Sequence, residues 1–182
     1  MTILDTTCFY FDGGGGSTSG GGTSSGGGSS YPTNSTTGTK TQAVNNGLQS
    51  ARTKLQNQQC RDLLTQFTNP ATGTTLFNVM QQRGYSDPGA YITQAVYYKD
   101  GQSHADMNGG YPCSTGGVYA WVAQPGLTTV WVCDRFKDLA GTAGLAADYL
   151  IHEMLHTLGL PEGGNNLTSD QITNMVQAAC GA

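Results

Sequence analysis

Charged residues are scarce in this chain of 182 residues. Asp, Glu, Lys and Arg make up 11% of it, whereas ordinary globular domains contain about 25%. The low charge predicts a surface of Ser, Thr, Asn, Gln and Gly, which is typical of extracellular proteins. The net charge is −4, and Lys and Arg form no run. This excludes a protein that binds nucleic acid by neutralising phosphates.

Long hydrophobic runs are missing as well. No apolar stretch in the sequence approaches the roughly 20 residues that a membrane-spanning helix needs. The length matches a single domain. We therefore expect a soluble globular domain with neither a nucleic-acid partner nor a membrane span.

The first 30 residues differ in composition from the rest. Residues 13–30 are only Gly, Ser and Thr, which bury no apolar surface and therefore predict a flexible linker. Residues 1–12 form a short N-terminal segment without the basic and apolar regions of a signal peptide. We expect a globular unit over 31–182 whose export signal was removed or belongs to a longer precursor. The alternative is a cytosolic protein with a flexible N-terminus.

The first half of the globular unit has a helical pattern. Thr39 and Gln42 match a capping box, and apolar residues recur at helical spacing until Asn69-Pro70 ends the pattern. One long amphipathic helix is therefore expected here, followed by a shorter helix over 76–84. We interpret the basic residues of the long helix as a solvated face without function: Lys40, Arg52, Lys54 and Arg61.

Two further helices are expected toward the C-terminus. Apolar residues recur at helical spacing over 142–158, and Gly159 predicts a left-handed cap, after which Pro161 cannot continue the helix. Thr168 and Gln171 match a second capping box. It predicts a short helix that continues to the last cysteine of the chain.

Strands are expected between these helices. Residues 90–99 carry a cluster of Tyr, Ile and Val, which favours a strand. Residues 118–122 and 128–133 form a predicted hairpin, because the intervening Gln-Pro-Gly has the sequence of a type II turn. We therefore expect an α+β fold. Its small twisted sheet packs on an active-site helix, with a long N-terminal helix and a short C-terminal helix.

The rarest reactive residues gather within the helix of 142–158 and just after it. The chain has only two Glu and three His, and four of these five lie between positions 152 and 162. His152 and His156 share one helical face one turn apart, so both imidazoles reach a single Zn²⁺. Glu153 points about 100° further around the helix, where its carboxylate reaches a metal-activated water as general base. This arrangement predicts peptide-bond hydrolysis.

The longer motif HEMLHTLGLPE resembles the zinc-binding signature of the metzincin clan of metallopeptidases, HExxHxxGxx followed by a ligand. In that clan a Gly ends the helix and the chain turns back with a third ligand. The resemblance implies these roles for Gly159 and Glu162. Metzincins usually have His or Asp at the latter position, and Met175 is expected in the core of the last helix instead of a Met-turn. The resemblance implies a zincin whose subgroup stays open.

Other residues are alternatives at this site. Asp170, at the start of the last helix, and His104 are the alternatives to Glu162 as third ligand. Asp148, one turn before His152, is expected to orient an imidazole or to be exposed. No Lys or Arg follows position 137, so the acids of the C-terminal segment favour a cation.

The cysteines indicate an oxidising compartment. Cys8 precedes the globular unit, and the four cysteines within it show no C-x-x-C spacing: Cys60, Cys113, Cys133 and Cys180. Two disulfides are expected, with three possible connectivities left open. The alternative is five reduced cysteines.

We therefore expect a secreted zinc metallopeptidase, an endopeptidase in preference to an exopeptidase, that acts as a monomer on peptide or protein substrates. One strand of the hairpin is expected to pair with an extended peptide, and Tyr149 is a candidate for stabilising the oxyanion. Two alternatives stay open. One is a non-enzymatic, disulfide-bonded interaction or adhesion module, and the other is a toxin-like peptidase domain at the C-terminus of a larger exported protein.

Overall fold

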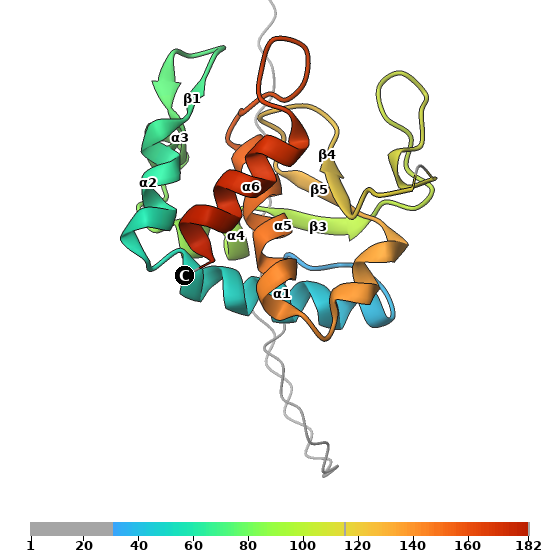
Figure 1. Cartoon of the computed structure of the whole chain (residues 1–182). Coiled ribbons are helices and arrows are strands. Elements are labelled where there is room, and N and C mark those ends of the chain that lie inside the picture. The colour runs from blue at the N-terminus through green and yellow to red at the C-terminus, as the bar shows by residue number, and fades with distance from the viewer. Residues whose placement is uncertain (1–30, 115, 182) are drawn as a thin grey trace, which may run out of the picture.

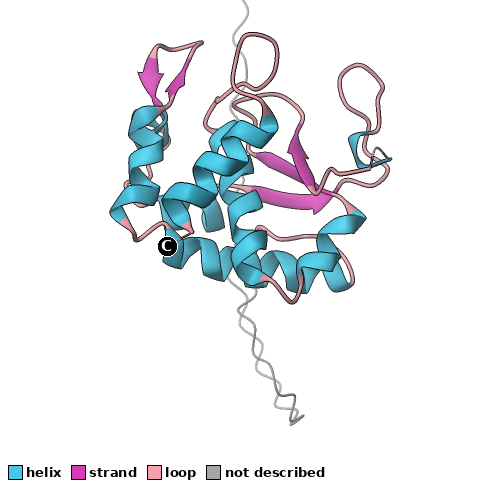
Figure 2. Ribbon diagram, viewed as in Figure 1, coloured by secondary structure: helices cyan, strands magenta, loops and turns pink. Residues whose placement is uncertain are grey.

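The computed structural model describes residues 31–114 and 116–181, so the expected N-terminal segment 1–12 and linker 13–30 lie outside the described residues. The fold is mixed α+β, as expected (Figures 1 and 2). The α-helices are α1 (Thr39–Lys54), α2 (Gln58–Gln66), α3 (Leu76–Gln82), α4 (Pro88–Gln94), α5 (Ala143–Thr157) and α6 (Ser169–Cys180). Two 3₁₀ helices are η1 (Pro112–Ser114) and η2 (Asp134–Leu139). The strands are β1 (Thr68–Asn69), β2 (Thr74–Thr75), β3 (Tyr97–Asp100), β4 (Ala120–Val122) and β5 (Thr129–Val132).

Strand β5 is the middle strand of the main sheet. It pairs in parallel with β3 and antiparallel with β4, with Trp121 opposite Trp131. Ala120, Val130 and Val132 are buried on the other face, which packs against α5, because side chains alternate along a strand. Within the described residues, the outer edge of β4 pairs with no strand.

The predicted hairpin is confirmed. The amide of Leu127 donates to the carbonyl of Gln124 at 3.1 Å, and Gly126 has φ +96°, as a type II turn requires. The amide of Gly126 also donates to the carbonyl of His156 at 2.8 Å. The turn of the hairpin is therefore fastened to the end of α5.

Helix α5 ends as the sequence predicts. Gly159 has φ +103° and its amide donates to the carbonyl of His156 at 2.9 Å. The amide of Leu160 donates to the carbonyl of Leu155 at 3.1 Å. These are the two hydrogen bonds of a Schellman motif. They turn the chain back beside the last turn of α5.

Arg83, which follows α3, binds groups around this same helix end. Its guanidinium donates to the carbonyl of Thr157 at 2.8 Å, to the carbonyl of Gly126 at 3.0 Å and to the hydroxyl of Tyr91 at 2.6 Å. A cation at a helix C-terminus interacts favourably with the carbonyls that lack helical partners. Arg83 thus fixes α5, α4 and the hairpin turn together.

The expected long helix is wrong, because two helices occupy 39–66. Asn57 caps α2 by accepting a hydrogen bond from the amide of Gln59, so the chain bends between α1 and α2. Both helices bury one apolar face in the same core. The apolar residues therefore recur at helical spacing on both sides of the bend, as they would in one continuous helix. The capping box at Thr39 is also wrong. Gly38 is the N-cap residue, and no side chain caps α1.

The strand expected over 90–99 is half wrong. Its first part is helix α4, and only Tyr97–Asp100 forms β3. Asp87 caps α4 by accepting hydrogen bonds from the amides of Gly89 and Ala90, and Pro88 occupies the first turn, where its fixed φ favours a helix. The cap outweighs the β propensity of the Tyr and Ile that follow. The helix expected over 76–84 and the C-terminal helix with its capping box are confirmed.

Two lysines of α1 form ion pairs, so the interpretation of its basic residues as a solvated face is wrong for them. Lys54 contacts Asp148 of α5 at 2.6 Å, and both side chains are mostly buried. Buried Lys40 contacts Asp100 of β3 and Asp134 of η2, each at 2.6 Å. Helix α1 crosses beneath α5 in Figure 1, and these pairs connect it to α5, the sheet and η2.

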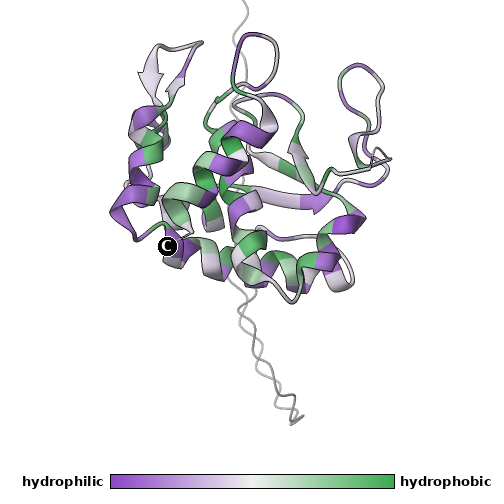
Figure 3. Ribbon diagram, viewed as in Figure 1, coloured by the Kyte–Doolittle hydropathy of each residue, from purple (hydrophilic) through white to green (hydrophobic). Residues whose placement is uncertain are grey.

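Two disulfides are present within residues 31–114 and 116–181, as predicted, and Cys8 lies outside these described residues. Cys60–Cys180 joins α2 to the end of α6, and Cys113–Cys133 joins η1 to the residue after β5. These bridges are compatible with an extracellular protein. Hydrophobic residues concentrate at the centre of the molecule, and hydrophilic ones follow the outer loops (Figure 3). None of the described helices has the length and hydropathy to cross a membrane.

We expect Lys40→Met to lower the free energy of unfolding by about 1–2 kcal/mol at pH 7, because it leaves two carboxylates without their partner. Burial disfavours charge on Asp100, but hydrogen bonds from Lys40 and Thr37 outweigh it and lower its pKa. The pair therefore stabilises the fold above the unfolded-state pKa of about 3.9. Urea unfolding should show the loss shrinking as the pH falls below about 4.

Lys137→Met is the matched control, since Lys137 and its neighbour Asp138 are both more than half exposed. Its effect should stay within about 0.5 kcal/mol. Equal losses for the two variants, or a loss at Lys40 that persists at pH 2, would contradict the account.

Candidate metal centre

Helix α5 brings the Nε2 atoms of two imidazoles together, with the ring planes 68° apart. His152 and His156 are both buried, and their Nε2 atoms lie 2.9 Å apart. Two facing lone pairs would repel each other, so this contact requires either a proton on one Nε2 that it donates to the other, or a metal ion bound to both. The sequence prediction that both rings reach a common point agrees with this geometry.

The other nitrogen of each ring is held by the protein. Nδ1 of His156 lies 2.7 Å from the carbonyl oxygen of Leu160, and a carbonyl only accepts, so Nδ1 carries the proton. Nδ1 of His152 lies 2.9 Å from the hydroxyl of Thr173 on α6. The carbonyl of Leu160 therefore leaves a lone pair on Nε2 of His156, and both contacts fix the orientation of their rings, as the outer contacts of metal-binding histidines do.

Glu162 reaches this pair from the chain that follows the Schellman motif. Its Oε2 lies 3.4 Å from Nε2 of His156 and 3.7 Å from Nε2 of His152. Hydrogen bonding to the two imidazoles holds the pKa of Glu162 far below its usual range. Burial lowers the pKa of His156, but its contacts with Glu162, Glu153 and Leu160 outweigh this effect and raise it overall.

These three side chains have the spacing of metal ligands. Their donor atoms are 2.9, 3.4 and 3.7 Å apart, whereas the ligand atoms of a tetrahedral zinc at about 2.0–2.1 Å lie about 3.3 Å from one another. Among the described residues, no other group of three His, Cys, Asp or Glu is so arranged. The donor set of two imidazoles and one carboxylate therefore fits a zinc ion.

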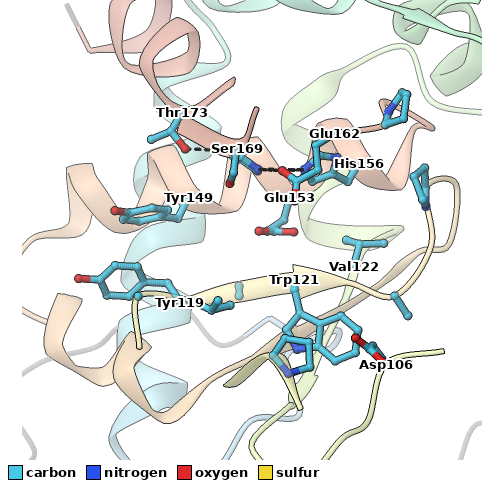
Figure 4. Close-up of a pocket in the computed structure, with 18 of the residues that line it drawn as sticks. Asp106, Tyr119, Trp121, Val122, Tyr149, Glu153, His156, Glu162, Ser169 and Thr173 are labelled. Carbon is cyan, nitrogen blue, oxygen red and sulfur yellow. Dashed lines mark hydrogen bonds and ion pairs between the residues drawn. The ribbon is translucent and has the colours of Figure 1, made fainter. Parts of the chain in front are cut away.

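Glu153 lies beside the three donors without joining them. It is 6% exposed, its Oε2 has no hydrogen-bond partner, and burial raises its pKa despite the nearby imidazoles. Figure 4 shows its carboxylate pointing into a cavity, away from the contact between His156 and Glu162. A buried carboxylate oxygen without a partner is costly, so this oxygen lacks a partner that a group bound at the cavity would supply.

The cavity has a volume of about 450 Å³ and runs along the free edge of β4. Tyr119 and Tyr149 form its wall on one side of Glu153, with ring centroids 4.5 Å apart. Their hydroxyls point away from His156 (Figure 4), so Tyr149 does not have the orientation expected of an oxyanion donor. Val122 lines the cavity on the other side of Glu153.

The alternative ligands lie elsewhere. His104 stacks on Trp131 with ring centroids 3.4 Å apart, and Asp170 is exposed in the first turn of α6. Neither belongs to the donor cluster. Asp148 is buried against Lys54, so the expectations that it orients an imidazole, or is exposed, are wrong. Met175 lies in α6 and packs partly buried against the core, as predicted.

Sequence reasoning missed the groups that orient the imidazoles. The carbonyl of Leu160 could have been found, because the cap predicted at Gly159 brings this residue back beside the helix. No sequence pattern indicates the contact of Thr173 with His152, because this contact depends on how α6 packs on α5. Arg83 is distant in sequence from the helix end that it binds, so no local pattern indicates it.

The comparisons with known proteins identify no relative of this chain. No family model matches it, and neither a curated protein nor a solved structure is similar to it. The chemistry of the site is therefore inferred from its own geometry.

We expect the Cys113–Cys133 bridge to hold the wall of the cavity that residues 106–117 contribute. The double variant Cys113→Ser/Cys133→Ser should speed amide hydrogen exchange in this segment about tenfold or more. Exchange in α5 should change little, because α5 is secured by other contacts. Hydrogen exchange with mass spectrometry measures both.

The double variant Cys60→Ser/Cys180→Ser is the comparison. This bridge spans 120 residues of sequence, so its loss should destabilise the whole described fold by several kcal/mol. Exchange would then rise in α5 as well. Unchanged exchange over residues 106–117 in the first variant would contradict the proposed tether.

Proposed function

We propose that this protein is a zinc-dependent metallopeptidase of the zincin type. One observation carries the proposal. Two histidines and a glutamate with ligand spacing share a cavity with the buried, unpartnered carboxylate of Glu153. Ligand residues alone suit a structural metal, whereas a carboxylate that does not bind the metal but reaches the same space suits hydrolysis.

Zinc is the metal that suits these residues best. His152, His156 and Glu162 would hold it, and three protein ligands are typical of catalytic zinc sites, which keep a position open. When bound, zinc supplies Lewis acidity that lowers the pKa of a water toward 7 and polarises a carbonyl. The hydrogen bonds that Nδ1 of each imidazole makes with Leu160 and Thr173 support this role because they orient both rings before the metal arrives.

Glu153 would carry the proton transfers. Its carboxylate accepts a proton from the attacking water and delivers it to the amine that leaves when the peptide bond breaks. Burial supports this role because it raises the pKa of Glu153. A general base works best when its pKa lies near the pH at which the enzyme works. Within the described cavity lining, no Lys or Arg contacts this carboxylate.

The substrate would be an extended peptide. Among the described residues, no strand pairs with the outer edge of β4, which runs along the cavity, and a peptide can add to such an edge as a further strand. Space continues on both sides of Glu153, toward Tyr119 and toward Val122 (Figure 4), which favours an endopeptidase. All these groups come from one chain, so we propose a monomer, secreted into an oxidising compartment where its two disulfides persist.

We expect Glu153→Gln to lower the rate of cleavage of an unfolded protein such as casein by about 10²–10⁴-fold or more. The amide keeps the size of the side chain but cannot accept the proton. Bound zinc should stay at one ion per chain, since Glu153 is not in the donor cluster. Peptide release and metal analysis of zinc-loaded protein measure the two quantities.

Asp170→Asn serves as the control for losing one acidic charge near the site. Asp170 is exposed and outside the donor cluster, so this variant should keep both zinc and activity. The proposal is wrong if the zinc-loaded parent cleaves no unfolded protein, or if Glu153→Gln cleaves as fast as the parent.

A further inference from the structure

We propose that the cavity binds a Lys or Arg side chain of the substrate, with its stem against Trp121 and its cationic group at Asp106. The inference rests on the proposed function for the reaction, and it adds the class of substrate. It depends on three features of the cavity: its charge, the free oxygen of Asp106 and the position of Trp121.

The charged side chains that line the cavity, apart from its histidines, are acidic. Asp106, Glu153 and Glu162 belong to the described lining, which contains no Lys or Arg. Glu162 contacts the two imidazoles and Glu153 is buried beside them. Asp106 is therefore the carboxylate available to a substrate side chain. Arg135 and Lys99 lie outside this lining, and each sits over an aromatic ring: Arg135 over Tyr119 at 4.7 Å and Lys99 over Trp131 at 6.0 Å.

Asp106 is half-buried and held in position by its own loop. Its Oδ1 accepts hydrogen bonds from the amides of Asn108 at 2.9 Å and Gly110 at 2.7 Å. Oδ2 has no hydrogen-bond or ion-pair partner among the described residues. A Cβ at position 110 would lie 2.9 Å from Oδ2, so Gly110 leaves room at this oxygen. A fixed carboxylate with one free oxygen loses little entropy when it binds a cation.

Trp121 provides an apolar surface on the same side of the cavity. Its side chain alternates with those of Ala120 and Val122 along β4, so it projects to the face of the sheet opposite α5. Figure 4 shows Asp106 near the indole of Trp121, across β4 from His156 and Glu162. Met107, 72% exposed, also lines this part of the cavity.

The geometry of strand addition brings a substrate side chain to this surface. A peptide paired with the edge of β4 directs alternate side chains to opposite faces of the sheet. A side chain on the face of Trp121 meets the indole and Met107 first and Asp106 at its end. Lys and Arg match this order, because each has an apolar stem and a cationic end. A neutral apolar side chain would leave Asp106 without a partner.

The test measures binding separately from catalysis. Calorimetric titration of the zinc-loaded Glu153→Gln variant, which does not turn over substrate, uses a blocked Ala/Gly peptide with one central Lys. The same peptide with norleucine in place of Lys is the second probe. Norleucine keeps the stem and lacks the charge. We expect the Lys peptide to bind about tenfold or more tightly.

Asp106→Asn in the Glu153→Gln background is the decisive variant. The Asn side-chain oxygen still accepts the hydrogen bonds of the loop, so the turn is kept while the charge is lost, and thermal unfolding checks that the fold is unchanged. The preference for Lys should fall to within about twofold. Asp138→Asn removes an equal charge from an exposed residue outside the cavity lining and should leave the preference intact.

Several results would overturn the assignment. These are equal binding of the two peptides, no binding of either peptide, or a preference for Lys that survives Asp106→Asn. The zinc-loaded parent protein then separates this inference from the proposed function. If the Lys peptide binds selectively but the parent does not cleave it, the result supports the Asp106 binding site and contradicts the proposed peptidase function.

Discussion

Burial of helix α5 on nearly every side is the constraint on which the rest of the structure depends. Helix α1 packs against it from one side, β4 and β5 from another and α6 from a third, and its residues from Leu150 to Thr157 are all buried. A helix surrounded in this way has little freedom to rotate or slide. The directions of His152, Glu153 and His156 are therefore fixed by packing.

Polar contacts also hold helix α5 in place along its length. Lys54 pairs with Asp148 in the second turn of the helix, and Arg83 binds carbonyl oxygens at its C-terminal end and at the hairpin turn. The amide of Gly126 in the same turn also donates to the carbonyl of His156. This bond holds the edge of β4 in a fixed position relative to the histidines. The cavity between the edge strand and the donor cluster is thus built by the contacts that hold the helix.

Local sequence patterns predicted those parts of the structure that contacts between residues near in sequence determine. Gly159 and the capping box at Thr168 gave correct helix ends, because each cap is a contact within a few residues of sequence. The break at Asn57 and the start of α4 at Asp87 were missed, although both are local caps. There, the continuing apolar pattern and the β propensity of residues 90–99 favoured other structures.

The site was predictable only in part. The spacing of His152 and His156 on a helix brings their rings together, and a Gly after the helix favoured Glu162 as the third residue, while Asp170 and His104 stayed open as alternatives. The roles of Thr173, Lys54 and Arg83 depend on how distant helices pack, and no short-range pattern encodes such contacts. Asp106 is distant in sequence from the motif, and only the folded structure brings it to the cavity.

The central claim is that His152, His156 and Glu162 together bind a catalytic zinc. X-ray absorption spectroscopy at the zinc edge, on protein loaded with one equivalent of zinc, tests it most directly. The account predicts scattering from two imidazoles and from oxygen ligands, with no sulfur, and loss of an oxygen ligand or of tight binding in Glu162→Gln. A third imidazole, a sulfur ligand, or an unchanged spectrum and affinity in Glu162→Gln would contradict it.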